Sequence, residues 1–344
     1  MEPPPVRYVK TRDGYSIAYT DTGAGPPFVL MPLPAGHVQM HWTGQSQISA
    51  WVEALSERYR LIVYDCRGQG MSQRGLSPGF DMSAPIRDLE AIVEGLDLSR
   101  FVLMGSHASG HTAVRYAVVQ PDRVRALVLA PCGVSASKWP MISAVDVAQR
   151  NWEFFLEIFA TSRGARSADA QKTTIEFLRQ SVNQEDWLIM ARSWMQSDIS
   201  SLLASVATPT LVLHPREYVN VPTEESMKLA SGITNSRLAL IDGNNPFGEA
   251  DSGLPVIEEL LGSLTPPETE WALQTGSELP AGRLSPRELD VLRLIAAGKS
   301  SREIAEDLVL SVRTVDRHIA NIYLKTETHG RAQATAYAIR NGYV

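Results

Sequence analysis

The chain has 344 residues, of which 44% are hydrophobic and 20% charged, a globular balance that argues against disorder and a length that suits two domains. Its two cysteines, Cys66 and Cys132, exclude a disulfide framework and a Cys-x-x-Cys metal or redox site. The net charge of −6 is unevenly distributed. Residues 281–344 hold 10 Lys and Arg against 7 Asp and Glu, and the rest of the chain holds 22 Lys and Arg against 31 Asp and Glu. The positive C-terminal part therefore favours an anionic partner.

We expect no secretory signal peptide in the first residues of the chain. They contain no apolar segment of signal-peptide length, and no run of about 18 apolar residues occurs anywhere. We therefore expect a cytoplasmic protein with no membrane partner. Residues 7–21 alternate in polarity and turn at Asp13-Gly14, which predicts a β-hairpin.

Short apolar runs then recur through the first 264 residues. They cover residues 28–31, 61–64, 101–104, 124–129, 210–214 and 238–241. Helical patterns lie between several of them, as at 82–96 and 109–119. Runs that are apolar throughout and separated by helices predict an α/β fold with a mainly parallel sheet covered on both faces.

Two segments interrupt this rhythm. Residues of about 135–205 show only helical periodicity, which predicts a helical cap over the sheet, and the rhythm resumes until a last helix over 254–264. Residues 265–283 are rich in Pro, Gly and Glu without apolar periodicity and are interpreted as a linker. We therefore expect one domain over residues 1–264 and an all-α domain over 284–344.

The C-terminal segment has clear helix boundaries. Ser285-Pro286-Arg287-Glu288 predicts a helix start and Gly298 its end. The expected buried stripe of this helix is Leu289, Leu292, Leu294 and Ile295. A second helix over 301–308, a tight turn and a third helix over 312–325, with Val315, Ile319 and Ile322 inward, match the DNA-reading unit whose last helix enters the major groove.

The outward side chains of this unit are expected to bind double-stranded DNA. Arginine bonds guanine edges, asparagine suits adenine, and aspartate accepts from cytosine. The predicted contacts are Ser301, Arg302, Arg313, Thr314, Asp316, Arg317, Ala320, Asn321 and Lys325, of which Ser301, Arg302, Thr314 and Lys325 are better placed to hold phosphates. His318 is interpreted as a packed histidine. The alternative is a helical bundle that serves only as an interface.

The stretch LSPRELDVLRLIAAGKSSREIAEDLVLSVRTVDRHIANIY closely resembles the LuxR/GerE-type helix-turn-helix domain. The resemblance covers nearly the whole domain and implies a transcription regulator. It also implies a fourth helix, about residues 331–341, used in a homodimer. Thr326 and Glu327 depart from the Leu-Gly pair that is usual in that family.

Three turns of the larger domain resemble those of α/β hydrolases. They are Asp65-Cys66-Arg67-Gly68-Gln69-Gly70-Met71-Ser72, Pro121-Asp122-Arg123-Val124 and Pro209-Thr210-Leu211-Val212-Leu213-His214. The resemblance implies that fold over residues 1–264. In such enzymes a serine on a strained turn after a strand is the nucleophile, with small residues two positions away on each side.

When the chain is aligned with that pattern, a different residue stands at each catalytic position. His107, between Gly105 and Ser109, stands at the nucleophile position, while Ser106 lies one residue early and is expected to point away. Tyr218 falls at the acid position and Asn244 or Asn245 at that of the histidine. Pro34 falls where a backbone N–H faces the oxyanion, and proline has no N–H. We therefore expect no enzymatic activity.

A concave site without turnover predicts a sensor. A small, partly apolar effector is expected to bias the DNA-binding domains, with no cofactor or metal. Its predicted contacts are Pro34, Ser106, His107, Ala108, Trp139, Trp152, Trp194, Tyr218 and Asn245. Two alternatives stay open: an unorthodox hydrolase with His107 as nucleophile, and a domain that acts only in dimerisation.

Overall fold

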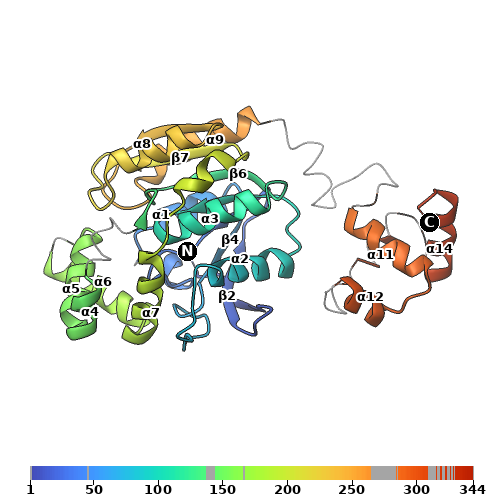
Figure 1. Ribbon diagram of the computed structural model, residues 1–344, viewed down its shortest axis with the longest axis horizontal. Helices are drawn as coiled ribbons and strands as arrows, with labels where there is room; N and C mark the ends of the chain where they lie inside the picture. Colours follow the sequence, from blue (N-terminus) through green and yellow to red (C-terminus); the bar gives the residue numbers. More distant parts are fainter. Residues whose placement is uncertain are drawn as a thin grey trace. The chain divides into compact units, whose positions relative to one another are not determined.

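The computed structural model describes two compact units, Met1–Leu264 and Thr265–Val344 (Figure 1). The described residues are 2–44, 46–136, 144–165, 167–264, 284, 286–308, 315, 318–319, 322–323, 326, 328 and 330–343. The expected linker, residues 265–283, lies outside them.

The larger unit is built on an eight-stranded sheet in the order β1-β2-β4-β3-β5-β6-β7-β8. The strands are β1 (Arg7–Lys10), β2 (Ser16–Thr22), β3 (Pro27–Leu30), β4 (Arg60–Tyr64), β5 (Phe101–Gly105), β6 (Val124–Leu129), β7 (Thr210–Pro215) and β8 (Ser236–Ile241). β2 pairs antiparallel with β1 and with β4, and all other pairs are parallel. The predicted hairpin and the mainly parallel sheet are therefore confirmed.

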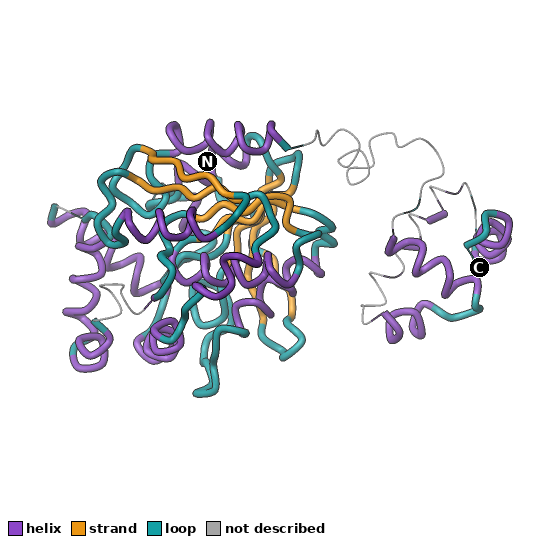
Figure 2. The backbone as a smooth tube through the Cα atoms, turned by 45° about the horizontal axis from the view of Figure 1, so that its top comes forward, coloured by secondary structure: helices purple, strands orange, loops and turns teal. Residues whose placement is uncertain are grey.

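Alternate side chains of the central strands enter two separate cores, because successive residues of a strand point to opposite faces. On β5, Leu103 packs with α2 (Ala84–Gly95), α3 (His107–Val119) and α8 (Thr223–Gly232). Its neighbours Val102 and Met104 pack with α1 (Ser49–Ser56) and α9 (Ala250–Ser263). Figure 2 shows helices on both sides of the sheet. Burial on both faces explains why the strands are apolar throughout.

The predicted helical cap is present. It consists of α4 (Val145–Arg150), α5 (Trp152–Ser162), α6 (Ala168–Ser181) and α7 (Gln184–Met195), which group together (Figure 1). Three of these helices begin at residues whose side chains accept a backbone N–H, namely Asn151, Ser167 and Asn183. Ala108 and Tyr218 of the sheet domain belong to the same buried cluster as the cap's aromatic side chains. The cap therefore packs onto the carboxyl edge of the sheet, where both residues lie.

The smaller unit contains α11 (Pro286–Ala296), α12 (Ser301–Leu308) and α14 (Arg331–Arg340). Val291, Leu292 and Ile295 of α11 are buried, whereas Leu289 and Leu294, expected in the stripe, are only partly buried. The described positions of the third helix include Val315, Ile319 and Ile322, all buried as expected. His318 is also buried, in agreement with its interpretation as a packed side chain.

Buried Arg67 ties the first hairpin turn to α2. Its Nε donates to Asp88 at 2.7 Å and its Nη1 to Asp13 at 2.6 Å, and Asp88 is fully buried. We expect Arg67→Met to lower the free energy of unfolding by about 3–5 kcal/mol, because it leaves a buried carboxylate without its partner. Urea denaturation followed by tryptophan fluorescence measures this, since residues 284–344 contain no tryptophan.

The matched control is Arg12→Met, which removes an exposed pair with Glu94. Its effect should stay below about 1 kcal/mol, because exposed ion pairs contribute little. Equal effects of the two substitutions would contradict a structural role for the buried pair.

Candidate functional site

The site is built around the turn that joins β5 to α3. Ser106 is extended, with φ −142° and ψ 151°, and His107 has φ 51°, in the left-handed region. A Cβ on Gly105 would lie 2.8 Å from the carbonyl oxygen of Ser109, so this turn requires glycine there. A non-glycine residue in the left-handed region is strained, and such strain gathers at functional sites. The turn places the His107 ring beyond the carboxyl end of β5.

His107 joins two hydroxyl groups. Its Nδ1 is 2.8 Å from Ser106 Oγ, and its Nε2 is 2.8 Å from the hydroxyl of Tyr218, which follows β7. The His107 and Tyr218 rings meet edge to face, with centroids 5.9 Å apart. The expected proximity of His107 and Tyr218 is therefore observed. Ser106, expected to point away, instead bonds to His107, because the extended residue before the elbow directs its hydroxyl along the adjacent ring.

His107 and its neighbours His41 and Tyr218 are uncharged at pH 7, whereas Arg163 beside them is charged. Burial lowers the pKa of His107 to about 3, with a smaller contribution from the positive charge of Arg163. Burial lowers the pKa of His41 to about 3 and raises that of Tyr218 to about 12. The site thus offers hydrogen-bonding groups without a negative charge of their own.

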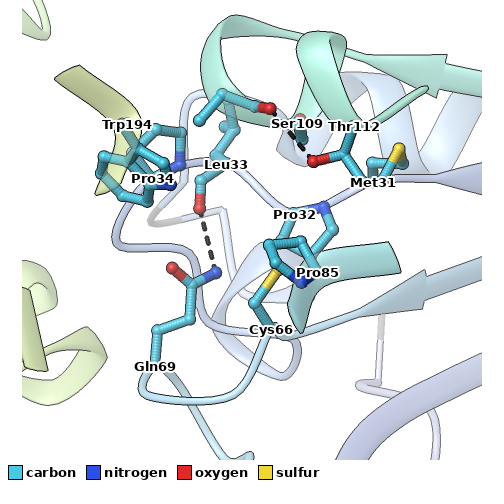
Figure 3. Close-up of a pocket in the computed structure, with 11 residues that line it drawn as sticks. Met31, Pro32, Leu33, Pro34, Cys66, Gln69, Pro85, Ser109, Thr112 and Trp194 are labelled. Carbon is cyan, nitrogen blue, oxygen red and sulfur yellow. Dashed lines mark hydrogen bonds between the residues drawn. The ribbon is translucent and has the colours of Figure 1, made fainter. Parts of the chain in front are cut away.

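A cavity lies at the start of α3, where Ser109 and Thr112 form part of its lining (Figure 3). The volume that a water molecule can reach inside it is about 20 Å³. It is lined by Met31, Pro32, Leu33, Pro34, Cys66, Gln69, Pro85, Ala108, Ser109, Thr112 and Trp194. Gln69 Nε2 donates to the carbonyl oxygen of Leu33 at 3.0 Å and fixes the loop after β3. The walls are mainly apolar, as in sites for small organic ligands.

Only part of the predicted ligand set lines this cavity. Pro34, Ala108 and Trp194 do, whereas Ser106, His107 and Tyr218 are not among its lining residues. Asn245 was wrongly placed with them, because its amide is used inside its own turn: Oδ1 accepts from Phe247 N at 2.9 Å and Nδ2 donates to Gly248 O. Trp152 stacks on Phe155 within the cap. Trp139 lies outside the described residues.

Arg163, which the sequence did not single out, lies beside the site. It follows α5, and its guanidinium donates to the carbonyl oxygen of Pro34. Its charge also acts on His41, His107 and Tyr218. An arginine at the end of an amphipathic helix looks like a surface residue in the sequence, so only the packed cap reveals its position.

Of the predicted DNA contacts, the structure describes Ser301 and Arg302. Ser301 Oγ accepts from Arg331 Nη2 at 2.8 Å, and Arg331 Nη1 donates to the carbonyl oxygen of Lys299 at 2.6 Å. Arg302 is exposed in the first turn of α12. The other predicted contacts lie outside the described residues: Arg313, Thr314, Asp316, Arg317, Ala320, Asn321 and Lys325. Arg331, which orders the start of α12, was missed because its partners are distant in sequence.

Thr326 was noted in the sequence as an unusual residue near the end of the third helix. Its hydroxyl donates to the carbonyl oxygen of Ile322 at 2.6 Å and lies 2.9 Å from the hydroxyl of Thr328. Both threonines are buried. The Thr326 hydroxyl, at a position where the family usually has an aliphatic side chain, therefore finds its hydrogen-bond partners within the same segment.

Comparison with protein families matches both units. Residues 33–217 match the family described as alpha/beta hydrolase fold, and residues 282–338 match the bacterial regulatory proteins of the luxR family. Among the described residues, none of the helices has the length and apolarity to cross a membrane. Nor do those residues bring three His, Cys, Asp or Glu side chains together as metal ligands.

Relatives of the larger unit are hydrolases. A 2-hydroxy-6-oxononadienedioate/2-hydroxy-6-oxononatrienedioate hydrolase of Cupriavidus pinatubonensis is 27% identical over 254 residues, which cover 69% of this chain and 87% of that protein. One of the same name from Escherichia coli is 27% identical over 241 residues, covering 64% and 81%. The crystal structure of the esterase RhEst1 from Rhodococcus sp. ECU1013 matches with a TM-score of 0.61 at 23% identity, covering 77% and 100%, and shows the same fold.

These relatives overturn one expectation. We expected no enzymatic activity, from an alignment that put other residues at the catalytic positions. The named relatives share 27% identity across most of their length and are hydrolases, which points to hydrolase activity in this unit as well. Different residues at single catalytic positions do not outweigh a sequence similarity to hydrolases that extends over the whole unit.

The depressed pKa of His107 predicts a pH dependence of stability. The folded protein keeps His107 neutral, whereas in the unfolded chain it takes up a proton near its ordinary pKa of 6.5. Lowering the pH below 6.5 therefore favours unfolding, and the loss continues until about pH 3. We expect His107→Gln to make the decline shallower by up to about 1.4 kcal/mol per pH unit.

Urea denaturation at several values between about pH 5 and 6.5 measures this slope. Tyr218→Phe is the control, since it removes the hydroxyl but leaves the imidazole buried, and it should keep the wild-type slope. A His107→Gln slope equal to that of the wild type would show that this imidazole is not buried as a neutral group.

Proposed function

We propose that a small molecule bound in the first unit controls the second. The chain belongs to the alpha/beta hydrolase fold family and carries a luxR-type regulatory domain. The luxR match identifies the chain as a DNA-binding regulator. In this proposal, a small, partly apolar effector binds beside the elbow and alters DNA binding by a cytoplasmic homodimer.

The observation that carries this proposal is the arrangement around His107. A strained, partly buried, neutral imidazole is held by two hydroxyls, and a small, mainly apolar cavity is lined by the next residue, Ala108. Neutral donors and acceptors beside apolar walls suit a partly apolar molecule, for which this cavity would have to widen. Trp194 lines the cavity and gives binding a fluorescence signal.

A second candidate function is hydrolysis at the same elbow. The imidazole of His107 occupies the strained position after β5, and its low pKa keeps it neutral and nucleophilic at pH 7. Attack of Nε2 on an ester carbonyl would expel the alcohol and form an acyl-imidazole, which water would hydrolyse. Tyr218 hydroxyl, now on Nε2, would have to move onto the carbonyl oxygen. The hydrolase names of the relatives support this candidate.

One experiment separates the two candidates. The protein selects DNA from a random pool in the presence and absence of candidate metabolites and esters. The solution is then analysed for hydrolysis products of the added compounds. An effector should change DNA affinity and quench tryptophan fluorescence, and His107→Trp should abolish both by filling the space beside the elbow while leaving basal DNA affinity unchanged. Consumption of an ester that stops in His107→Gln would identify hydrolysis. A DNA affinity indifferent to every compound would contradict effector control.

The DNA contacts proposed for the third helix have distinct signatures. Arg317→Ala should alter sequence preference, with a loss of about 1–3 kcal/mol at one base position. Lys325→Ala should weaken all sequences alike and reduce the salt slope by about one. Fluorescence anisotropy on the selected site and on a scrambled duplex measures both effects.

Arg12→Ala, in the larger unit, is the charge-matched control and should change neither quantity. If Arg317→Ala and Lys325→Ala also leave a confirmed complex unchanged, the third helix does not read DNA in the proposed way.

A further inference from the structure

The start of α12 in the smaller unit is held by a side chain from α14. Arg331, the first residue of α14, donates from Nη1 to the carbonyl oxygen of Lys299 at 2.6 Å and from Nη2 to Ser301 Oγ at 2.8 Å. Ser301 and Arg331 are 30 positions apart in the sequence. One guanidinium therefore joins the first turn of α12 to a helix that is distant along the chain.

Local contacts hold the same turn and use its acidic side chains. The backbone N–H and the hydroxyl of Ser300 donate to Glu303 at 2.8 and 2.7 Å, and Glu303 N donates back to Ser300 Oγ at 3.3 Å. This reciprocal pair is a capping box. Lys299 Nζ pairs with Asp307. Both carboxylates therefore bind partners other than Ser301.

The contact with Arg331 orients the hydroxyl of Ser301. A serine hydroxyl has one proton to donate and two lone pairs that accept, whereas a guanidinium can only donate. Arg331 therefore occupies a lone pair, and the hydroxyl proton must point elsewhere. Among the described residues, none accepts that proton. Donation from a charged group also polarises the hydroxyl and strengthens the bond that it donates in turn.

This oriented hydroxyl lies where the unit is expected to meet DNA. Ser301 is partly exposed, and the next residue, Arg302, is exposed. In helix-turn-helix units the helix before the reading helix crosses the DNA backbone, and α12 has that place in the chain. Hydroxyl and arginine side chains are common donors to phosphate oxygens.

We propose that Arg331 is a positioning residue for DNA binding. By filling a lone pair of Ser301, it directs the hydroxyl proton of Ser301 toward a phosphate of the DNA backbone, which Arg302 also contacts. A residue of α14 thus sets a contact that α12 makes. This inference rests on the DNA binding proposed above and is independent of any effector.

A double-mutant cycle in the full chain tests the proposal, with Ser301→Ala, Arg331→Gln and the double variant. Fluorescence anisotropy measures the affinity for a labelled duplex of the selected sequence and for a scrambled duplex. Each single substitution should weaken binding of both duplexes about 10-fold, because each removes the same charge-assisted contact. The double variant should stay within about 2-fold of the weaker single variant.

Three readouts separate positioning from a general loss of structure. A phosphate contact carries no sequence information, so the ratio of the two affinities should stay within about 2-fold of the wild-type ratio. Arg331→Lys keeps a charged donor for Ser301 and should recover most of the affinity. Arg340→Gln removes an exposed arginine of the same helix, which bonds to the carbonyl oxygen of Ala336, and should leave both affinities within about 2-fold of wild type.

Far-UV circular dichroism of every variant shows whether its helices are intact before binding is measured. If Arg331→Gln loses helix content, Arg331→Met replaces it in the cycle, because methionine keeps an apolar stem in place of the arginine stem. The cycle can then be completed with folded protein.

A double variant weakened by the product of the single effects, about 100-fold, would overturn the positioning role. A wild-type affinity of Arg331→Gln, or no binding of either duplex by the wild type, would overturn it as well. The proposed function fails differently. If the cycle is coupled but no compound alters DNA affinity, the positioning role stands and effector control falls. If a compound alters DNA affinity while the two substitutions act independently, effector control stands and the positioning role falls.

Discussion

The left-handed turn at His107 is the constraint on which the site depends. β5 ends against the first residues of α3 so closely that position 105 has no room for a side chain, and the next two residues must pass from extended to left-handed backbone. This geometry projects one side chain beyond the sheet edge, where the loops after β3 and β7 also arrive. The Tyr218 hydroxyl reaches His107 because β5 and β7, which the two residues follow, end at the same edge of the sheet.

The electrostatics of the site follow from where the cap packs. Covering the sheet edge with aromatic side chains excludes water, which holds the nearby histidines and tyrosine in their uncharged forms. The same burial leaves the charge of Arg163 less screened than it would be at the surface. The cap thus surrounds His107 with uncharged hydrogen-bonding side chains and one cation, Arg163.

Much of the fold was predictable from the sequence because the central strands are buried on both faces and therefore uniformly apolar. The elbow was located because small residues at 105 and 109 flank a single larger one. Side-chain directions were not predictable: Asn245 bonds within its own turn, and the Ser106 hydroxyl turns toward the adjacent ring. Arg163 was missed because its importance comes from cap packing and not from a motif. The prediction of no activity was wrong because it relied on the residues at four positions and ignored the similarity of the whole unit to hydrolases.

Control of DNA binding by a ligand requires the ligand to favour one arrangement of the chain over another. In the larger unit, the cap meets the sheet domain through a shared apolar cluster and through polar contacts: Asp186 accepts from the backbone N–H groups of Gly75 and Leu76, and Arg163 donates to Pro34. Polar contacts of this kind exchange partners more readily than a packed apolar core does. The contact between Arg163 and Pro34 joins the cap to the loop after β3, and Pro34 lines the cavity, so a ligand that displaced this contact would shift the cap relative to the sheet. The cap, and not the rigid sheet, is therefore the element whose position a ligand can bias.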